Sequence, residues 1–74
     1  MNAEELLRRY ADGERDFEGV DLRRVDLCNA NLSGINLRNS YIEESGLIHI
    51  NLSGANLYQF YMKLHRMKIL FRGH

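Results

Sequence analysis

The 74-residue sequence lacks proline and tryptophan and contains a single cysteine, Cys28. One thiol excludes an internal disulfide framework and is typical of a reducing compartment, so we expect a cytoplasmic protein. No apolar run approaches the ~18 residues that a membrane-spanning helix needs, and the charged segment at 4–9 does not resemble a signal peptide. The length allows one domain, whose stability is marginal without help from a metal or a partner.

Motifs for catalysis and metal binding are also absent. The three histidines have no metal-ligand spacing with Cys28, and nothing resembles CxxC, HExxH or a glycine-rich phosphate loop. The adjacent carboxylates Glu43 and Glu44 have no predicted cleft around them. We therefore expect no enzyme activity, no catalytic residue, no bound metal, no cofactor and no small-molecule substrate.

What the sequence does contain is an internal repeat. The segments NLSGINL at 31–37 and NLSGANL at 51–57 match at six of seven positions, with a constant offset of twenty in the numbering. Read in units of five from Arg15, the chain gives nine units whose second residue is Asp or Asn in seven cases. The third residue is apolar in every unit: Phe17, Leu22, Leu27, Leu32, Leu37, Ile42, Leu47, Leu52 and Leu57.

A period of five fits neither a helix nor a flat strand. Residues five apart lie about 140° from each other on a helix, and an odd spacing alternates between the two faces of a strand. A chain that turns a corner every five residues keeps its first and third places inside. Four such sides close one coil of the chain, and four times five explains the offset of the matching heptapeptides.

These units resemble the pentapeptide-repeat proteins, whose consensus is A(D/N)LXX. The resemblance covers residues 15–59, with 60–64 as a degenerate tenth unit. It implies an all-β solenoid, a right-handed quadrilateral β-helix of about 2.5 coils. Tyr41 and Gly46 depart from the consensus in the second place, and Ser40 and Ser45 in the first, so we expect weaker packing in the middle coil.

The single domain is expected to have three segments: an N-terminal capping helix at 1–14, the β-helix at 15–59, and a degenerate repeat with a basic amphipathic cap at 60–74. The first segment is similar to the N-terminal helix of many bacterial, notably cyanobacterial, members. Asn2 and Glu5 form a capping-box pattern, which predicts a helix from about Ala3 to Asp12 over the first coil. Leu6, Leu7 and Tyr10 are predicted to form its apolar stripe.

The segment 60–74 is predicted less clearly. On a helical wheel Phe60, Leu64, Met67 and Phe71 fall within about 60°, so a C-terminal capping helix is possible. Partial alternation of apolar residues leaves a further strand open. The segment holds four basic residues and no acid, giving +4 against −4 for residues 1–59. It is predicted to cap the last coil, to join two copies end to end, or to bind an anionic membrane or nucleic acid.

The register of the coils also predicts the most featured outer surface. It places Arg23, Glu43 and Lys63 in one column, and Tyr41 and Tyr61 beside it above Asp21. Alternating charges along such a column are favourable. We regard Tyr41, Tyr61, Arg23, Glu43 and Lys63 as a possible interaction surface, and Phe60, Leu64, Met67 and Phe71 as a possible end cap or dimer interface.

The function that this sequence favours is a non-enzymatic structural or protein–protein interaction module. Its protein partner is unknown, and a homodimer through the C-terminal end is possible. One alternative is a DNA-mimic regulator of DNA gyrase, as some long family members are, although that role calls for an extended acidic rod. The other is peripheral binding to an anionic membrane or nucleic acid through the basic tail, which we rank last.

Overall fold

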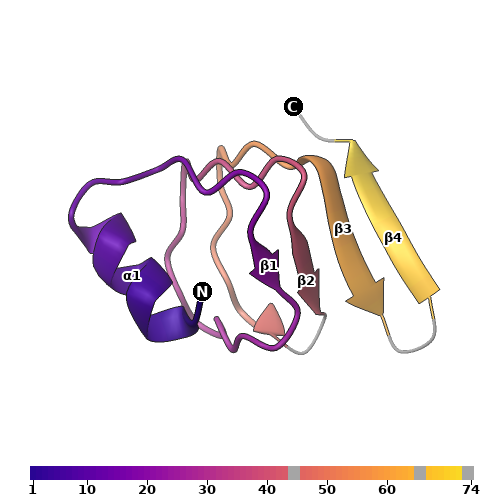
Figure 1. The fold of residues 1–74 in the computed structure, drawn as a ribbon, viewed down its shortest axis with the longest axis horizontal. Helices are drawn as coiled ribbons and strands as arrows, with labels where there is room; N and C mark the ends of the chain where they lie inside the picture. The colour runs from indigo at the N-terminus through magenta and orange to yellow at the C-terminus, as the bar shows by residue number, and fades with distance from the viewer. Residues whose placement is uncertain (44–45, 65–66, 73–74) are drawn as a thin grey trace.

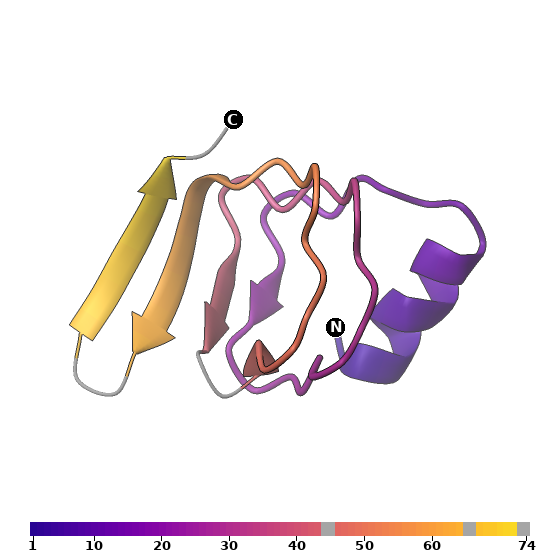
Figure 2. The same cartoon turned by 180° about the vertical axis from the view of Figure 1, so that it is seen from behind.

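A computed structural model of the chain describes residues 1–43, 46–64 and 67–72. Within these ranges the elements are α1 (Ala3–Ala11), β1 (Asp21–Leu22), β2 (Tyr41–Glu43), β3 (Tyr58–Leu64) and β4 (Met67–Arg72). The strands form one sheet in the order β1-β2-β3-β4. Helix α1 lies at one end of the long molecular axis and β4 at the other (Figure 1, and from behind in Figure 2).

Backbone pairing repeats with the offset of twenty that the heptapeptides predict. Strands β1, β2 and β3 are parallel, and their register places Tyr41 between Asp21 and Tyr61. Isolated bridges repeat the same offset on other sides of the chain path: Asp16 with Asn36, Asn36 with Asn56, and Asn31 with Asn51. Segments one offset apart therefore form successive rungs of a β-helix-type solenoid.

The Asp and Asn residues in the second place form turns, as their local bonding tendency predicts. In each of the seven units the side-chain oxygen accepts a hydrogen bond from the amide two residues later. The donor–acceptor distances lie between 2.9 and 3.3 Å. The accepting residues are Asp16, Asp21, Asp26, Asn31, Asn36, Asn51 and Asn56. Local hydrogen bonds thus fix each corner without help from a ligand.

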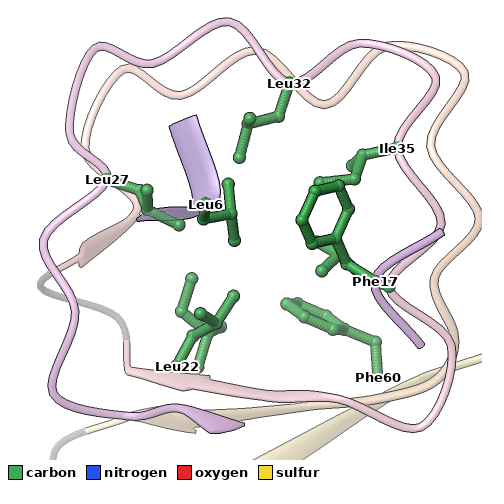
Figure 3. Packing of buried hydrophobic residues seen from close by; sticks show 9 residues of the cluster. Leu6, Phe17, Leu22, Leu27, Leu32, Ile35 and Phe60 are labelled. Atoms are coloured by element: carbon green, nitrogen blue, oxygen red, sulfur yellow. The ribbon is translucent and has the colours of Figure 1, made fainter. Parts of the chain in front are cut away.

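The apolar third places fill the interior. Phe17, Leu22, Leu27, Leu32 and Leu37 are each at most 1% exposed. Figure 3 shows labelled members of this cluster pointing into the centre of the loop that the backbone traces. Burial of each leucine stabilises the fold by about 1.5–3 kcal/mol, so the leucine columns are the main stabilising feature.

Helix α1 covers the N-terminal end of this core. The Asn2 side chain accepts a hydrogen bond from the Glu5 amide at 2.8 Å, which confirms the predicted start. The helix ends at Ala11, one residue before the predicted end. Leu6 is fully buried, but the predicted apolar stripe is wrong at Leu7, which is 38% exposed because consecutive helical residues lie about 100° apart.

The predicted weakness of the middle rung is wrong for Ser40 and Gly46. Ser40 is buried with its hydroxyl bonded: it accepts from the Val20 amide at 3.1 Å and lies 3.2 Å from the Phe17 carbonyl, to which it donates. At Gly46 a Cβ atom would lie only 2.4 Å from the Val25 carbonyl oxygen. Both departures from the consensus therefore suit their positions; Ser45 lies outside the described residues.

The possible C-terminal helix is wrong, because β4 is a strand that pairs antiparallel with β3. The four residues predicted to form one helical face are instead Cα partners across the two strands, Phe60 with Phe71 and Leu64 with Met67. A short isolated helix is marginally stable in water, whereas a strand satisfies the free hydrogen-bonding edge of β3. This pairing with β3 decides the structure of the segment.

Candidate functional site

Two tyrosines stack on the outer face of the sheet. Tyr41 on β2 and Tyr61 on β3 are Cα partners, and their ring centroids lie 5.1 Å apart with an interplanar angle of 17°. The Arg23 guanidinium lies 5.4 Å from the centroid of the Tyr41 ring. The register therefore brings three of the predicted surface residues into one aromatic and cationic cluster, because side chains at paired positions lie on the same face.

The charges on this face pair differently from the prediction. Glu43 and Lys63 are Cα partners, so that part of the column is present. Arg23, however, forms its ion pair with Asp21 on its own side of the solenoid, through Nε at 2.9 Å and Nη2 at 2.7 Å. The column is therefore not a ladder of ion pairs: the pKa of Arg23 is raised first by its hydrogen bond to Asp21, and Glu43 adds a smaller favourable charge. Asp and Arg two residues apart on an extended segment point the same way, and that spacing could have identified the pair.

The Arg23–Asp21 pair also fixes the charge of the face. Hydrogen bonds from the Arg23 side chain, and next from its amide, hold the pKa of the Asp21 carboxyl far below its ordinary value. The same side-chain hydrogen bond raises the pKa of Arg23. Both groups therefore remain ionised across the physiological pH range, and the guanidinium beside Tyr41 keeps its positive charge.

A shallow open groove of about 570 Å³ adjoins this cluster. It runs from the N-terminus of the chain across the sheet to β3, and it contains both acidic and basic side chains. Its lining residues are Met1, Asn2, Asp21, Arg23, Arg24, Val25, Glu43 and Lys63. Mixed charge in an open groove suits contact with another protein better than enclosure of a small molecule.

The second set of predicted site residues has a different environment. Phe60 is 1% exposed and belongs to the same buried core cluster as Phe17 (Figure 3). Leu64, Met67 and Phe71 are placed by their backbone register in the β3–β4 pair, and their side chains lie outside the described residues. Phe60 is therefore a core residue, and a role for the other three in an interface stays a prediction.

The part of the chain that the structure covers contains neither a candidate metal-binding group nor a candidate membrane-spanning helix. No group of three or more His, Cys, Asp or Glu side chains could hold a metal ion there. No helix within the same ranges is long and apolar enough to cross a membrane. His65 and His74 lie outside the described residues.

Cys28 is the one thiol, and its surroundings oppose reactivity. A hydrogen bond with the Asp26 carboxylate raises the pKa of the half-buried thiol, and burial adds to the effect. The thiolate is the reactive form, so a raised pKa leaves little of it at neutral pH. The geometry thus gives no support to Cys28 as a nucleophile.

We predict that Asp26→Asn accelerates alkylation of Cys28. Removing the carboxylate removes the largest cause of the raised pKa, so more thiolate is present at pH 8 and the rate rises severalfold. Asn occupies the same place in other repeats, for example Asn31 and Asn36, so the turn is expected to persist. The measurement is the iodoacetamide reaction rate against pH for both proteins. Superimposable rate profiles would contradict the role of Asp26.

The chain is similar to known proteins over its repeat segment. The family profile described as pentapeptide repeats matches residues 21–59 in eight copies. The uncharacterized protein slr1851 of Synechocystis sp. (strain ATCC 27184 / PCC 6803 / Kazusa) is 54% identical over 37 residues. The matched segment is 50% of this chain and 23% of that protein, so the chain spans less than a quarter of the length of this relative.

Proposed function

Since this chain belongs to the pentapeptide-repeat family, we propose that it is a non-enzymatic structural module that binds another protein through its sheet face. We further propose that the solenoid is a right-handed quadrilateral β-helix of about 2.5 coils, and that the protein works in a bacterial cytoplasm. Hydrogen-bond ladders at a constant offset of twenty in the numbering support this geometry. The similarity to a cyanobacterial protein supports a bacterial source for this chain.

The observation that carries the proposed function is the stacked Tyr41–Tyr61 pair with Arg23 beside it. Tyrosine and arginine are, with tryptophan, the residues enriched at the energetic centres of protein interfaces. Tyr41 remains 37% exposed although it is stacked, so a large rigid ring faces solvent. Side chains already held by stacking and by an ion pair lose little conformational entropy on binding.

The charges around the tyrosines indicate what the partner presents. Asp21 already neutralises Arg23, whereas Lys63 on β3 is exposed beside the stacked rings. Glu43 adds an acceptor in the neighbouring column. We propose a partner segment that places an apolar side chain on the Tyr41 ring and a carboxylate near Lys63.

Site-specific photocrosslinking tests this function. A benzophenone amino acid replaces Tyr41 in one protein and Ile48 in a control, and both are incubated with a cyanobacterial lysate. Ile48 is a suitable control because it is 55% exposed and belongs to a different side of the solenoid. We expect a discrete adduct from position 41 alone, and its loss when Lys63→Glu is added.

Equal labelling from both positions, or no adduct at either, would contradict binding through the sheet face. If the adduct contains a DNA gyrase subunit and the chain also inhibits supercoiling, the gyrase-regulator alternative replaces the general interaction role. Circular dichroism of each labelled protein checks that the fold is retained.

A further inference from the structure

The outer edge of β4 is the free edge of the sheet. Strand β4 is last in the order β1-β2-β3-β4, and it pairs with β3 on one side only. It stands at the end of the molecule opposite α1 (Figure 1, and from behind in Figure 2). Over residues 1–43, 46–64 and 67–72 no other strand pairs with this outer edge. An edge of this kind presents a row of backbone donors and acceptors, which is a template for another extended segment.

The segment that contains this edge is basic. Residues 60–74 include four Lys and Arg residues and no Asp or Glu. Two of the four, Lys68 and Arg72, belong to β4, and Lys68 is the Cα partner of Lys63 on β3. Like charges directly opposite each other in a sheet are unfavourable. A negative charge in the next strand position relieves this repulsion, so the edge favours an acidic neighbour.

The same charges argue against other occupants of the edge. Basic residues on an edge strand hinder its pairing with a second copy of the same strand. A nucleic acid or an anionic membrane surface matches the positive charge, but neither supplies the alternating N–H and C=O groups of a ladder. A peptide supplies both carboxylates and backbone groups, and addition of a strand to a free edge is a recurring mode of peptide recognition.

The positions along β4 indicate the spacing of the partner residues. Lys68 and Arg72 are four residues apart, about 13 Å along an extended strand, and Leu70 is midway between them. Leu70 is the Cα partner of Tyr61, so the row of Cα partners that contains the two tyrosines continues to β4. The complementary segment therefore has two acidic residues four positions apart and an apolar residue midway.

We propose that the outer edge of β4 binds an extended acidic segment of another protein as a fifth strand of the sheet. Backbone hydrogen bonds hold the segment, and its two carboxylates opposite Lys68 and Arg72 set the register. This surface is an edge of the sheet, whereas the stacked tyrosines lie on the outer face. The inference therefore does not rest on the function proposed above, and either can fail alone.

Calorimetric titration of the full chain with capped heptapeptides tests this proposal. The acidic probe is Thr-Glu-Thr-Leu-Thr-Glu-Thr, and a basic probe has lysine in place of both glutamates. Two further versions of the acidic probe are N-methylated at the odd or at the even positions, which removes one set of amide donors and keeps the charge. We expect the acidic probe to bind and the basic probe not to bind. Only one methylated version is expected to bind, because alternate amides of a strand face the same edge.

Charge reversal at Lys68 locates the site. We expect Lys68→Glu to weaken binding of the acidic probe at least about tenfold and to bind the basic probe instead. The fold is expected to persist, because the new carboxylate is opposite Lys63. Arg8→Glu is the matched control: Arg8 is exposed on α1, at the other end of the molecule, and its reversal changes the net charge equally. This variant is expected to bind the acidic probe like the original chain.

Hydrogen exchange followed by NMR places the peptide on the original chain. The acidic probe is expected to slow exchange of alternate amides of β4, namely those that do not already bond to β3, and to leave the amides of α1 unchanged. This measurement decides the location even if Lys68→Glu fails to fold.

Four results would overturn the proposal. The acidic probe does not bind, or it binds without protecting any amide of β4. Both methylated versions bind as well as the parent probe, and a short oligonucleotide competes with them, which would mean charge attraction alone. Folded Lys68→Glu binds the acidic probe like the original chain. The alternate β4 amides are already protected without peptide in a protein that light scattering shows to be a dimer, which would make a second copy the occupant.

Discussion

Gly46→Ala is expected to lower the melting temperature by at least about 10 °C. The new Cβ atom would lie 2.4 Å from the Val25 carbonyl oxygen, and a backbone atom cannot rotate away as a side chain can. The Gly46 carbonyl also accepts the Leu27 amide at 3.2 Å, so relief by backbone movement disturbs the ladder. Overpacking with a backbone shift costs about 3 kcal/mol, and each kcal/mol corresponds to about 4–8 °C in a domain of this size.

Gly34→Ala is the matched control for this experiment. Gly34 has a φ of +73°, and nothing lies within 4 Å of a Cβ atom built there. The change costs only the left-handed conformational penalty of about 1–2 kcal/mol. Thermal unfolding followed by circular dichroism compares the two variants. A smaller shift for Gly46→Ala than for Gly34→Ala would contradict the steric argument.

The repeat and its core were predictable because they follow from a single spacing. A period of five with an apolar third place leaves one way to bury every leucine, and the register between rungs follows from it. Leu22, Ile42 and Met62 are successive Cα partners in the paired strands, as the offset of twenty requires. The Tyr41–Tyr61 neighbourhood on the candidate surface follows from the same register.

The features that were not predictable depend on contacts between rungs or on competition between partners. Nothing in the sequence around Gly46 shows that the Val25 carbonyl approaches it, so the repeat pattern alone wrongly indicates a weak point there. Arg23 has two acidic neighbours, Asp21 two residues earlier in the chain and Glu43 one rung away. The spacing of two indicates Asp21 and the repeat register indicates Glu43, and the side-chain geometry selects Asp21.

The C-terminal segment was not predictable for a different reason. Its apolar residues fit both a helical stripe and an alternating strand, so local periodicity could not decide between them. The deciding factor is the free edge of β3, with which β4 pairs over six Cα partners. Such an edge is a property of the assembled solenoid, and therefore no pattern within residues 60–74 reveals it.

Phe60→Ala is expected to have the largest effect on stability among substitutions in the C-terminal half. Phe60 occupies a first place, where other repeats carry smaller residues such as Val20 and Ser40. Its side chain is 1% exposed and belongs to the buried core cluster, so it packs the last rung into the core (Figure 3). Truncating a buried phenylalanine costs about 3–5 kcal/mol. A domain of this length is expected to have only about 4–11 kcal/mol in total.

Tyr58→Ala controls for the loss of an aromatic ring from the same strand. Tyr58 is 43% exposed, and the Arg38 guanidinium lies 5.5 Å from its ring centroid. Losing that cation–π contact costs about 0.5–1 kcal/mol. Urea unfolding therefore separates the variants: Tyr58→Ala keeps a cooperative transition near the original midpoint, whereas Phe60→Ala shifts it to much lower urea. Equal midpoints would mean that Phe60 is not part of the core. That result would also remove the reason to regard β3 as the strand that ties the C-terminal end to the solenoid.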